Sequence, residues 1–355
     1  MKILVINPGS TSTKIAVFED EQNIFQKNLQ HDADDLRNFK IITEQFAFRK
    51  KAILDVLCEA GYEVNDFNAI VGRGGIIHPV SSGVYAINET MKDDLRTCRF
   101  GEHASNLGAL IADDIAGTIP GCKSYIADPV VVDELQDVAR IAGHPLFKRT
   151  AIFHALNHKV IAKSYAKKTG RTYEELNLIV AHLGGGISVG AHRKGKIIDV
   201  SNAVDGEGPF SPERSGTLPA LQVAELCFSG KYTLPQIKKI LTGEGGMVAH
   251  LGTNQFQKIE QELIPAGDKK AALIHEAMAY NIAKFIGAMY TVLEGKVDAI
   301  ILTGGIAWNP LIVESITKKV NYIAPVSVYP GEDEMGALAS NGLRALKGEV
   351  EVLVY

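Results

Sequence analysis

The sequence has little cysteine, and its cysteines form no paired motif. Cys58, Cys98, Cys122 and Cys227 stand far apart among 355 residues, without a C-x-x-C pair. Disulfide frameworks and zinc sites both need cysteines at short or regular spacings. We therefore expect four buried, free thiols in a reducing compartment, and a cytoplasmic protein.

Long apolar runs and a basic excess are missing as well. The apolar run at residues 3–6 is too short for a signal peptide, and no run approaches the ~20 residues that span a bilayer. The 37 basic residues are outnumbered by 41 acidic ones, whereas nucleic-acid-binding surfaces need clustered basic side chains. We therefore expect neither a membrane nor a nucleic acid as a partner.

The chain instead alternates between two kinds of segment. Apolar runs rich in β-branched residues occur at 3–6, 69–71, 178–181 and 299–302, and amphipathic stretches such as 271–293 lie between such runs. Runs of this length are typical of buried strands, and helical spacing of apolar residues is typical of surface helices. This alternation predicts an α/β fold.

The two halves of the chain resemble each other. Residues 2–13 and 177–188 both indicate a buried strand, a turn of small residues and a second strand. Residues 68–77 and 298–307 both indicate a buried strand that runs into a Gly-Gly turn. Small residues let a backbone approach phosphate closely, and successive N–H groups in a turn bind anions. The repeat therefore predicts duplicated domains with a nucleotide cleft between them.

Five segments, in chain order, resemble motifs of the acetate kinase family. They are NPGSTSTK at 7–14, FHALNH at 153–158, AHLGGG at 181–186, ERSG at 213–216 and TGGI at 303–306. The spelling FHALNH and the run DGEGPFSPERSGTLP, which begins at Asp205, are similar to the butyrate kinase branch of that family.

The resemblance implies a fold and a domain division. The fold is α/β, with two duplicated actin-like (ribonuclease H-like) domains and a nucleotide cleft between them. The first domain would comprise residues 1–150 plus 334–355, with a returning C-terminal helix, and the second, adenosine-binding domain would comprise residues 151–333. The resemblance also implies a homo-oligomer, at least a dimer.

The resemblance further implies a butyrate kinase reaction. The γ-phosphoryl group of ATP would pass reversibly to the carboxylate of a short-chain fatty acid, butyrate or a branched-chain acid, with Mg²⁺ present. Two alternatives stay open at this point: an acetate or propionate kinase, and an actin-like, ATP-dependent conformational switch without a metabolite substrate. The chain length of the acid and the preferred direction also stay open.

Four residues match catalytic positions of the family. The resemblance implies that Arg73 and Arg214 bind the carboxylate and the transferring phosphoryl group, and that His154 hydrogen-bonds the phosphoryl oxygens. A guanidinium suits this work because its planar fork grips carboxylate or phosphate oxygens. The carboxylate of the substrate is already ionised at pH 7 and needs no base in order to attack. Asp128 is therefore assigned to positioning the magnesium-bound water and the phosphoryl group.

Further residues match positions that hold nucleotide and metal. The nucleotide-binding residues implied by the resemblance are Asn7, Ser10, Ser12, Lys14, His182, Gly184, Gly185, Gly186, Gly304 and Gly305. Asn7, Asp333 and Glu334 are implied for Mg²⁺, and the choice among Glu332, Asp333 and Glu334 stays open. The alternative for this acidic run is a cap on a helix that begins near Met335.

Gly74 and Gly75 depart from the acetate kinase pattern, which has two valines after the arginine that matches Arg73. One hypothesis is that the missing side chains open room for a longer acid, each buried methylene being worth ~0.8 kcal/mol. The other is that the glycines serve only the turn.

Overall fold

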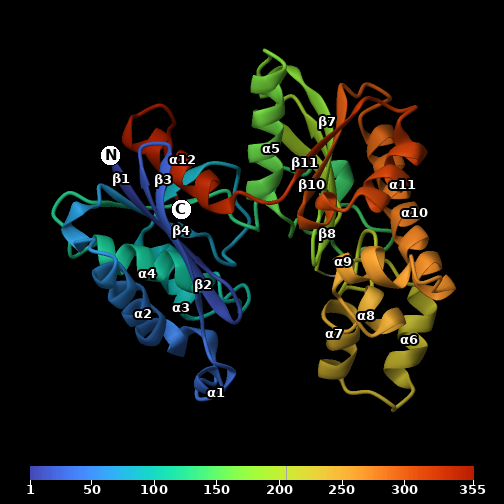
Figure 1. Ribbon diagram of the computed structural model, residues 1–355, viewed down its shortest axis with the longest axis horizontal. Helices are drawn as coiled ribbons and strands as arrows, with labels where there is room; N and C mark the ends of the chain where they lie inside the picture. Colours follow the sequence, from blue (N-terminus) through green and yellow to red (C-terminus); the bar gives the residue numbers. More distant parts are fainter. Residues whose placement is uncertain (205) are drawn as a thin grey trace. The chain divides into compact units, whose positions relative to one another are not determined.

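The computed structural model describes residues 1–204 and 206–355, so Asp205 lies outside the described residues. The chain forms two compact units (Figure 1): unit 1 comprises Met1–Val132 and Asp333–Tyr355, and unit 2 comprises Asp133–Glu332. The sequence analysis placed these limits at 150/151 and 333/334. That the two units act as separate functional domains stays a prediction. Within the described residues, no helix is long and apolar enough to cross a membrane.

Unit 1 is built on a seven-stranded mixed sheet in the order β12-β5-β6-β4-β1-β2-β3. The strands are β1 Lys2–Pro8, β2 Ser12–Glu19, β3 Gln22–Gln30, β4 Ala69–Arg73, β5 Val84–Ala86, β6 Lys123–Ala127 and β12 Val352–Val354. The helices are α1 Ala33–Leu36, α2 Phe46–Glu59, α3 Glu89–Arg96, α4 Asn106–Ala116 and α12 Glu334–Leu346, with the 3₁₀ turns η1 Ile42–Gln45 and η2 Val64–Asp66.

Unit 2 is built on a five-stranded sheet in the order β11-β10-β7-β8-β9. The strands are β7 Asn177–Leu183, β8 Ile187–Arg193, β9 Lys196–Val200, β10 Ala299–Gly304 and β11 Val326–Pro330. The helices are α5 Ala155–Lys168, α6 Ala220–Phe228, α7 Leu234–Thr242, α8 Gly246–Leu251, α9 Phe256–Lys258, α10 Lys269–Val292 and α11 Pro310–Val320. Short helical turns are η3 Asp137–Arg140, η4 Tyr173–Glu175, η5 Ile259–Leu263 and η6 Gly305–Trp308.

Five strands of each sheet share one topology, which confirms the duplication. In unit 1, β1 pairs antiparallel with β2 and parallel with β4, and β4 pairs parallel with β6. In unit 2, β7 pairs antiparallel with β8 and parallel with β10, and β10 pairs parallel with β11. The predicted strands fall on β1, β4, β7 and β10, and the predicted amphipathic stretch falls on α10.

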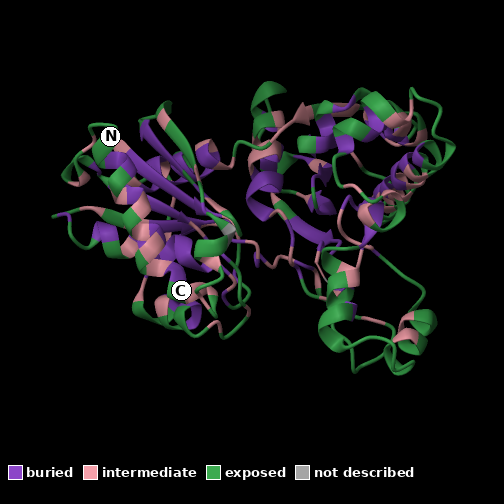
Figure 2. Cartoon of the chain, turned by 60° about the horizontal axis from the view of Figure 1, so that its bottom comes forward, coloured by how far each residue is buried: buried purple, intermediate pink, exposed green. Residues whose placement is uncertain are grey.

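Each sheet is covered by helices on both faces, which buries its central strands (Figure 2). In unit 1, Ile70 of β4 packs in one core with α4, while its neighbour Val71 lies against Gly342 of α12. In unit 2, α10 packs with Ile179 on one face of β7, and α5 packs with Leu178 on the other. Successive residues of a strand point to opposite faces, so strands covered on both faces read as continuous apolar runs.

The expectation for the cysteines is partly wrong. All four are free thiols, but Cys58 and Cys227 are exposed and the other two are half-buried. Cys227 lies on α6, a helix that buries none of its residues. Cysteine is among the residue types most often buried, so its type alone indicated burial, whereas the position on the helix decides it.

Candidate active site

Three polar residues lie at one edge of the sheet of unit 1. Asn7 is near the end of β1, Arg73 ends β4, and Asp128 directly follows β6. These three strands are parallel and adjacent, with Ile6 paired to Gly72 and Arg73 paired to Ala127. Their carboxyl ends therefore meet at the same edge, where open α/β sheets place ligand sites.

Arg73 and Asn7 both bind Glu334, the first residue of α12. The two guanidinium nitrogens Nη1 and Nη2 of Arg73 lie 3.0 Å from Oε2 and Oε1 of Glu334. Asn7 donates from Nδ2 to Oε2 of Glu334 at 2.7 Å and accepts from Arg73 Nη1 at 3.2 Å. The fork of Arg73, predicted to grip a substrate carboxylate, thus holds a carboxylate of the protein itself.

The acidic run before α12 divides into three roles. Asp333 caps the helix, because its Oδ1 accepts from the backbone N–H of Gly336 at 2.8 Å. Glu332 belongs to unit 2, where its Oε1 lies 3.1 Å from His182 Nε2. Among the described residues, no group of three or more His, Cys, Asp or Glu is arranged to hold a metal ion. Glu334, the third residue of the run, is bonded to Asn7 and Arg73.

Asp128 is fixed rather than mobile. Its side chain is buried, and Oδ1 accepts from the Ser82 hydroxyl at 2.6 Å and from the Gly83 backbone N–H at 2.9 Å. Its φ of 39° lies in the left-handed region, which Asp tolerates better than most residues. The turn after β6 therefore holds this carboxylate in one orientation.

The backbone of the first turn, between β1 and β2, is hydrogen-bonded by Arg49, a residue that the sequence analysis missed. Arg49 has no exposed surface and donates to the carbonyls of Gly9 at 2.7 Å, Ser10 at 2.9 Å and Ser12 at 2.9 Å. Burial lowers the pKa of Arg49 to about 10, so it is charged at pH 7. The predicted residues Ser10 and Lys14 are exposed, and Ser12 is half-buried. The one sequence signal that could have identified Arg49 is that it is an arginine within a helix.

The hypothesis that Gly74 and Gly75 open a pocket is wrong. A Cβ on Gly74 would lie 2.6 Å from the Cβ of Pro129, and a Cβ on Gly75 would lie 2.6 Å from the Cα of Asn106. Both glycines are buried against these neighbours. They permit the close approach of the β4 turn to Pro129 and to the start of α4, so the room for a longer acid is not beside their Cα atoms.

The second turn, Gly184–Gly186 between β7 and β8, lies against Arg214. A Cβ on Gly186 would sit 2.2 Å from Arg214 Nη1, so glycine leaves the room that the guanidinium occupies beside this backbone. Ser211 donates from its hydroxyl to the carbonyl of Gly185 at 2.5 Å, which ties the turn to the segment that carries Arg214. Burial lowers the pKa of Arg214 from its usual value, and the neighbouring Glu213 opposes that shift.

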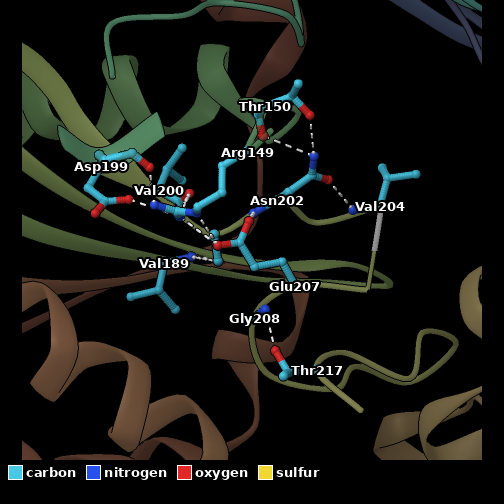
Figure 3. Close-up of polar contacts among 12 residues, drawn as sticks. Arg149, Thr150, Val189, Asp199, Val200, Asn202, Val204, Glu207, Gly208 and Thr217 are labelled. Atoms are coloured by element: carbon cyan, nitrogen blue, oxygen red, sulfur yellow. Dashed lines mark hydrogen bonds and ion pairs between the residues drawn. The ribbon is translucent and has the colours of Figure 1, made fainter. Parts of the chain in front are cut away.

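Figure 3 shows how the loop after β9 is anchored. Arg149 donates to Glu207 at 2.7 Å and to Asp199 at 3.0 Å, and Asn202 donates to the carbonyl of Thr150 at 3.0 Å. Farther along, Arg214 Nη1 donates to the carbonyl of Ala203 at 2.6 Å. These bonds connect β9 with the loop and so fix the position of Arg214.

His154 and His182 stack beside the second turn. Their ring centroids are 3.7 Å apart and the rings are nearly parallel, at 14°. His182 is the penultimate residue of β7, two positions before Gly184, and its Nδ1 lies 2.9 Å from Asn157 Oδ1. His154 directly precedes α5, and its Nδ1 lies 3.0 Å from the hydroxyl oxygen of Ser188.

A pocket of about 600 Å³ opens in unit 2, between the second turn and the glycine turn that follows β10. Its lining includes Gly184, Gly185, Gly305, Trp308 and Glu332. Pockets of this size bury small organic ligands. Gly304 does not line it: its φ of 90° needs glycine, and its role is to start the turn that presents the next residue.

Several of the predicted residues therefore gather into one cluster in each unit. In unit 1 the structure joins the predicted catalytic Arg73 to the predicted metal ligand Glu334, near Asp128. In unit 2 it joins His154, His182 and the turn residues Gly184, Gly185 and Gly186 to Arg214. Each cluster combines cationic or imidazole side chains with a turn of small residues, which is a chemistry suited to anionic ligands.

Comparison with known proteins identifies the family of the chain. Residues 122–328 match the model of the acetokinase family. A protein of Phocaeicola vulgatus named probable butyrate kinase is 57% identical over 355 residues, 100% of this chain and 99% of that protein. Butyrate kinase 2 of Clostridium acetobutylicum is 54% identical over 354 residues, 100% of this chain and 99% of that protein.

The fold has a counterpart among solved structures. The crystal structure of Porphyromonas gingivalis acetate kinase covers 98% of this chain and 99% of its own, with a TM-score of 0.79 and 19% identity. This likeness confirms the predicted fold class of duplicated actin-like α/β domains. With the family model and the full-length relatives, the finding is that this chain belongs to the acetokinase family.

Proposed function

We propose that this protein is a butyrate kinase, which transfers the γ-phosphoryl group of ATP reversibly to the carboxylate of butyrate or a related short-chain acid. The observation that carries this proposal is full-length identity of 57% and 54% with proteins that bear the butyrate kinase name. The product is an acyl phosphate, formed as the acid's carboxylate oxygen bonds to phosphorus and the bond to the ADP oxygen breaks.

The chain's own residues would bind and orient the two anions. Arg73 and Arg214 neutralise charge on the acid and on the transferring phosphoryl group, which a largely electrostatic reaction requires. His154 donates a hydrogen bond to a phosphoryl oxygen. Asp128, fixed by Ser82 and Gly83, positions groups at the edge of the sheet instead of removing a proton.

The residues proposed for the nucleotide lie in each of the two units. Ser10 of the first turn, Ser12 and Lys14 at the start of β2, and Gly184–Gly186 of the second turn would contact phosphates, and His182 lies beside the second turn. The adenosine occupies the pocket lined by Gly305 and Trp308. Membership of a kinase family implies ATP as the phosphoryl donor.

The donor set near the first turn fits Mg²⁺. Asn7 Oδ1 and the Glu334 carboxylate are oxygen donors, which Mg²⁺ prefers, and it keeps several waters, so two protein ligands suffice. When bound, Mg²⁺ neutralises charge on the phosphates. Glu334 would then exchange some of its contacts with Arg73, which frees the guanidinium for substrate. Asp333, predicted as a third ligand, is already engaged as a helix cap.

We also propose a homo-oligomer, at least a dimer, in the cytoplasm. The helix α6 supports an oligomer, because it is apolar yet buries no residue, and Phe228 at its end is 92% exposed. Exposed apolar surface of this kind is often covered by a partner.

The proposed reaction is tested by measuring ATP consumption with Mg²⁺ and no acid, acetate, propionate, butyrate or isobutyrate, while acyl phosphate is trapped as hydroxamate. We expect the highest kcat/KM with butyrate or isobutyrate. A maximum with acetate or propionate would instead identify an acetate or propionate kinase. ATP hydrolysis that no acid alters would favour the conformational switch.

The arginines provide a second test. Arg73→Ala or Arg214→Ala should lower kcat by on the order of 10³, because an electrostatic stabiliser of the transferring phosphoryl group is lost. Circular dichroism should show the fold intact. Wild-type rates in a folded double variant would end the assignment of these two residues.

A further inference from the structure

A buried series of hydrogen bonds leads from His154 into the core of unit 2. His154 Nδ1 and His158 Nε2 each lie 3.0 Å from the hydroxyl oxygen of Ser188. His158 Nδ1 lies 3.2 Å from His192 Nε2, and His192 Nδ1 lies 2.8 Å from the hydroxyl oxygen of Tyr173. Ser188, His158 and His192 have no exposed surface. We call these five residues the Tyr173–His154 network.

Regular structure fixes the members of this network. His158 lies on α5, one helical turn after His154, and η4 carries Tyr173. Ser188 and His192 are four residues apart on β8, so they share one face of the strand. The series therefore does not depend on a loop.

The two interior histidines are neutral. Burial lowers the pKa of both His158 and His192 well below the usual 6.5, and the charge of Lys159 acts in the same direction. Lys159 is itself held by Glu134 at 2.7 Å. A neutral imidazole donates from one nitrogen and accepts at the other. The hydrogens from Tyr173 through His192 and His158 to Ser188 must therefore all point in one direction.

The phenol at the far end selects that direction. A phenol is a stronger donor than a neutral imidazole N–H, and an imidazole nitrogen is a stronger acceptor than a phenol oxygen. The Lys159 ammonium lies 5.4 Å from the centre of the Tyr173 ring and makes the phenol a stronger donor still. Tyr173 then donates to His192, and His192 Nε2–H donates to His158. His158 Nε2–H donates to Ser188, whose hydroxyl donates to His154 Nδ1.

We propose that the Tyr173–His154 network holds His154 in the tautomer that carries its proton on Nε2, so that this imidazole presents an N–H donor to the phosphoryl group. The opposite tautomer would present a lone pair, which repels phosphoryl oxygens. Tyr173, His192, His158 and Ser188 are positioning residues, because they act through His154. The inference rests on the proposed function, because it takes from it that His154 donates a hydrogen bond to the phosphoryl group.

The test removes the hydroxyl at the far end. Tyr173→Phe should change His154 from the Nε2–H tautomer to a mixture, as read from its imidazole ¹⁵N shifts, with the signals assigned by His154→Gln. We expect kcat with butyrate to fall about fivefold to tenfold, the effect of one buried hydrogen bond, with both KM values nearly unchanged. Tyr165→Phe is the matched control, since Tyr165 packs against the same core cluster outside the network and should keep wild-type values.

A double-variant cycle separates positioning from general packing. Ser188→Ala disconnects His154 from everything beyond it, so adding Tyr173→Phe should not lower kcat further. Additive losses, an unchanged tautomer in Tyr173→Phe, or an Nδ1–H tautomer in the wild type would each overturn the network. A wild type without butyrate kinase activity would instead overturn the proposed function, while the ¹⁵N shifts would still report on the tautomer.

Discussion

Arg49 of α2 engages three backbone carbonyls of the first turn, and its Nε donates to Gln45 at 2.9 Å. When carbonyls point inward to a guanidinium, the N–H groups and hydroxyls of a turn are left to face outward. A phosphate-binding turn needs this orientation. The buried charge also adds a positive potential beneath the site.

We predict that Arg49→Met raises the KM for ATP about tenfold and lowers the free energy of unfolding by about 2–4 kcal/mol, because several buried carbonyls lose their donor. Enzyme kinetics and urea unfolding measure the two effects. Lys51→Met, an exposed change on the same helix, is the control and should alter neither quantity. An unchanged KM in Arg49→Met would show that the turn keeps its shape without this support.

Most predicted site residues were found through local motifs, and their partners were not. Arg73 was predicted because it matches a catalytic position of the family, and Glu334 was predicted as a metal ligand. Nothing local predicted that these two residues, 261 positions apart, bind each other. The glycines after Arg73 were misjudged for the same reason. Whether the space beside a glycine is open depends on Pro129 and Asn106, which no local pattern brings next to it.

Helix α12 begins at the residues proposed for the metal. Asp333 accepts the N–H of Gly336, and Glu334 follows as the first helical residue. A cap and a metal ligand need different properties of the side chain at 333. The cap needs only an oxygen acceptor, while Mg²⁺ favours a negative charge.

We predict that Asp333→Asn leaves stability and the Mg²⁺ concentration for half-maximal activity unchanged, since the amide oxygen still caps α12. Asp333→Ala should lower the free energy of unfolding by about 1 kcal/mol. Glu334→Gln should raise the Mg²⁺ requirement, as measured by titrating Mg²⁺ in the activity assay. A raised requirement in Asp333→Asn would return Asp333 to the metal site.

Central elements could be predicted and peripheral ones could not. β1, β4, β7 and β10 are buried on both faces, so their sequences are continuous apolar runs. The edge strand β3, by contrast, has no buried residue and a polar sequence, which resembles a loop as much as a strand. Pairing with β2 decides its conformation.

At the scale of the whole molecule, three buried histidines affect stability in acid. Burial lowers the pKa of His31 in unit 1, and of His158 and His192 in unit 2. Each therefore binds its proton at a lower pH in the folded protein than in the unfolded chain. The unfolded state therefore gains protons, and stability falls as the pH decreases.

We predict that the free energy of unfolding decreases between about pH 6.5 and pH 5, by up to about 1.4 kcal/mol per pH unit for each of these histidines. Carboxylates with lowered pKa values, such as Glu276, lose their contribution only at lower pH. Calorimetric unfolding at several pH values measures the slope. His31→Gln should reduce it and the exposed His78→Gln should not; a flat profile would contradict the prediction.

The duplicated architecture could be read from the repeats, because each copy has its own strands and turn. The limits of the units could not, since they depend on which segments pack together. The segment 133–150 packs with unit 2, where Arg149 binds Asp199, although the sequence grouped it with the first half.

Unit 1 is discontinuous in the chain, and this has a consequence for its synthesis. Its sheet includes β12, and α12 packs on β1 and β4, yet both follow the 200 residues of Asp133–Glu332. On the ribosome, which adds about 5–20 residues per second, the first half must wait at least about ten seconds with one face of its sheet uncovered. Unit 2, one uninterrupted segment, can fold during that interval. The first part of this protein to emerge is thus the last to be completed, and it is the part for which a holding chaperone would matter most.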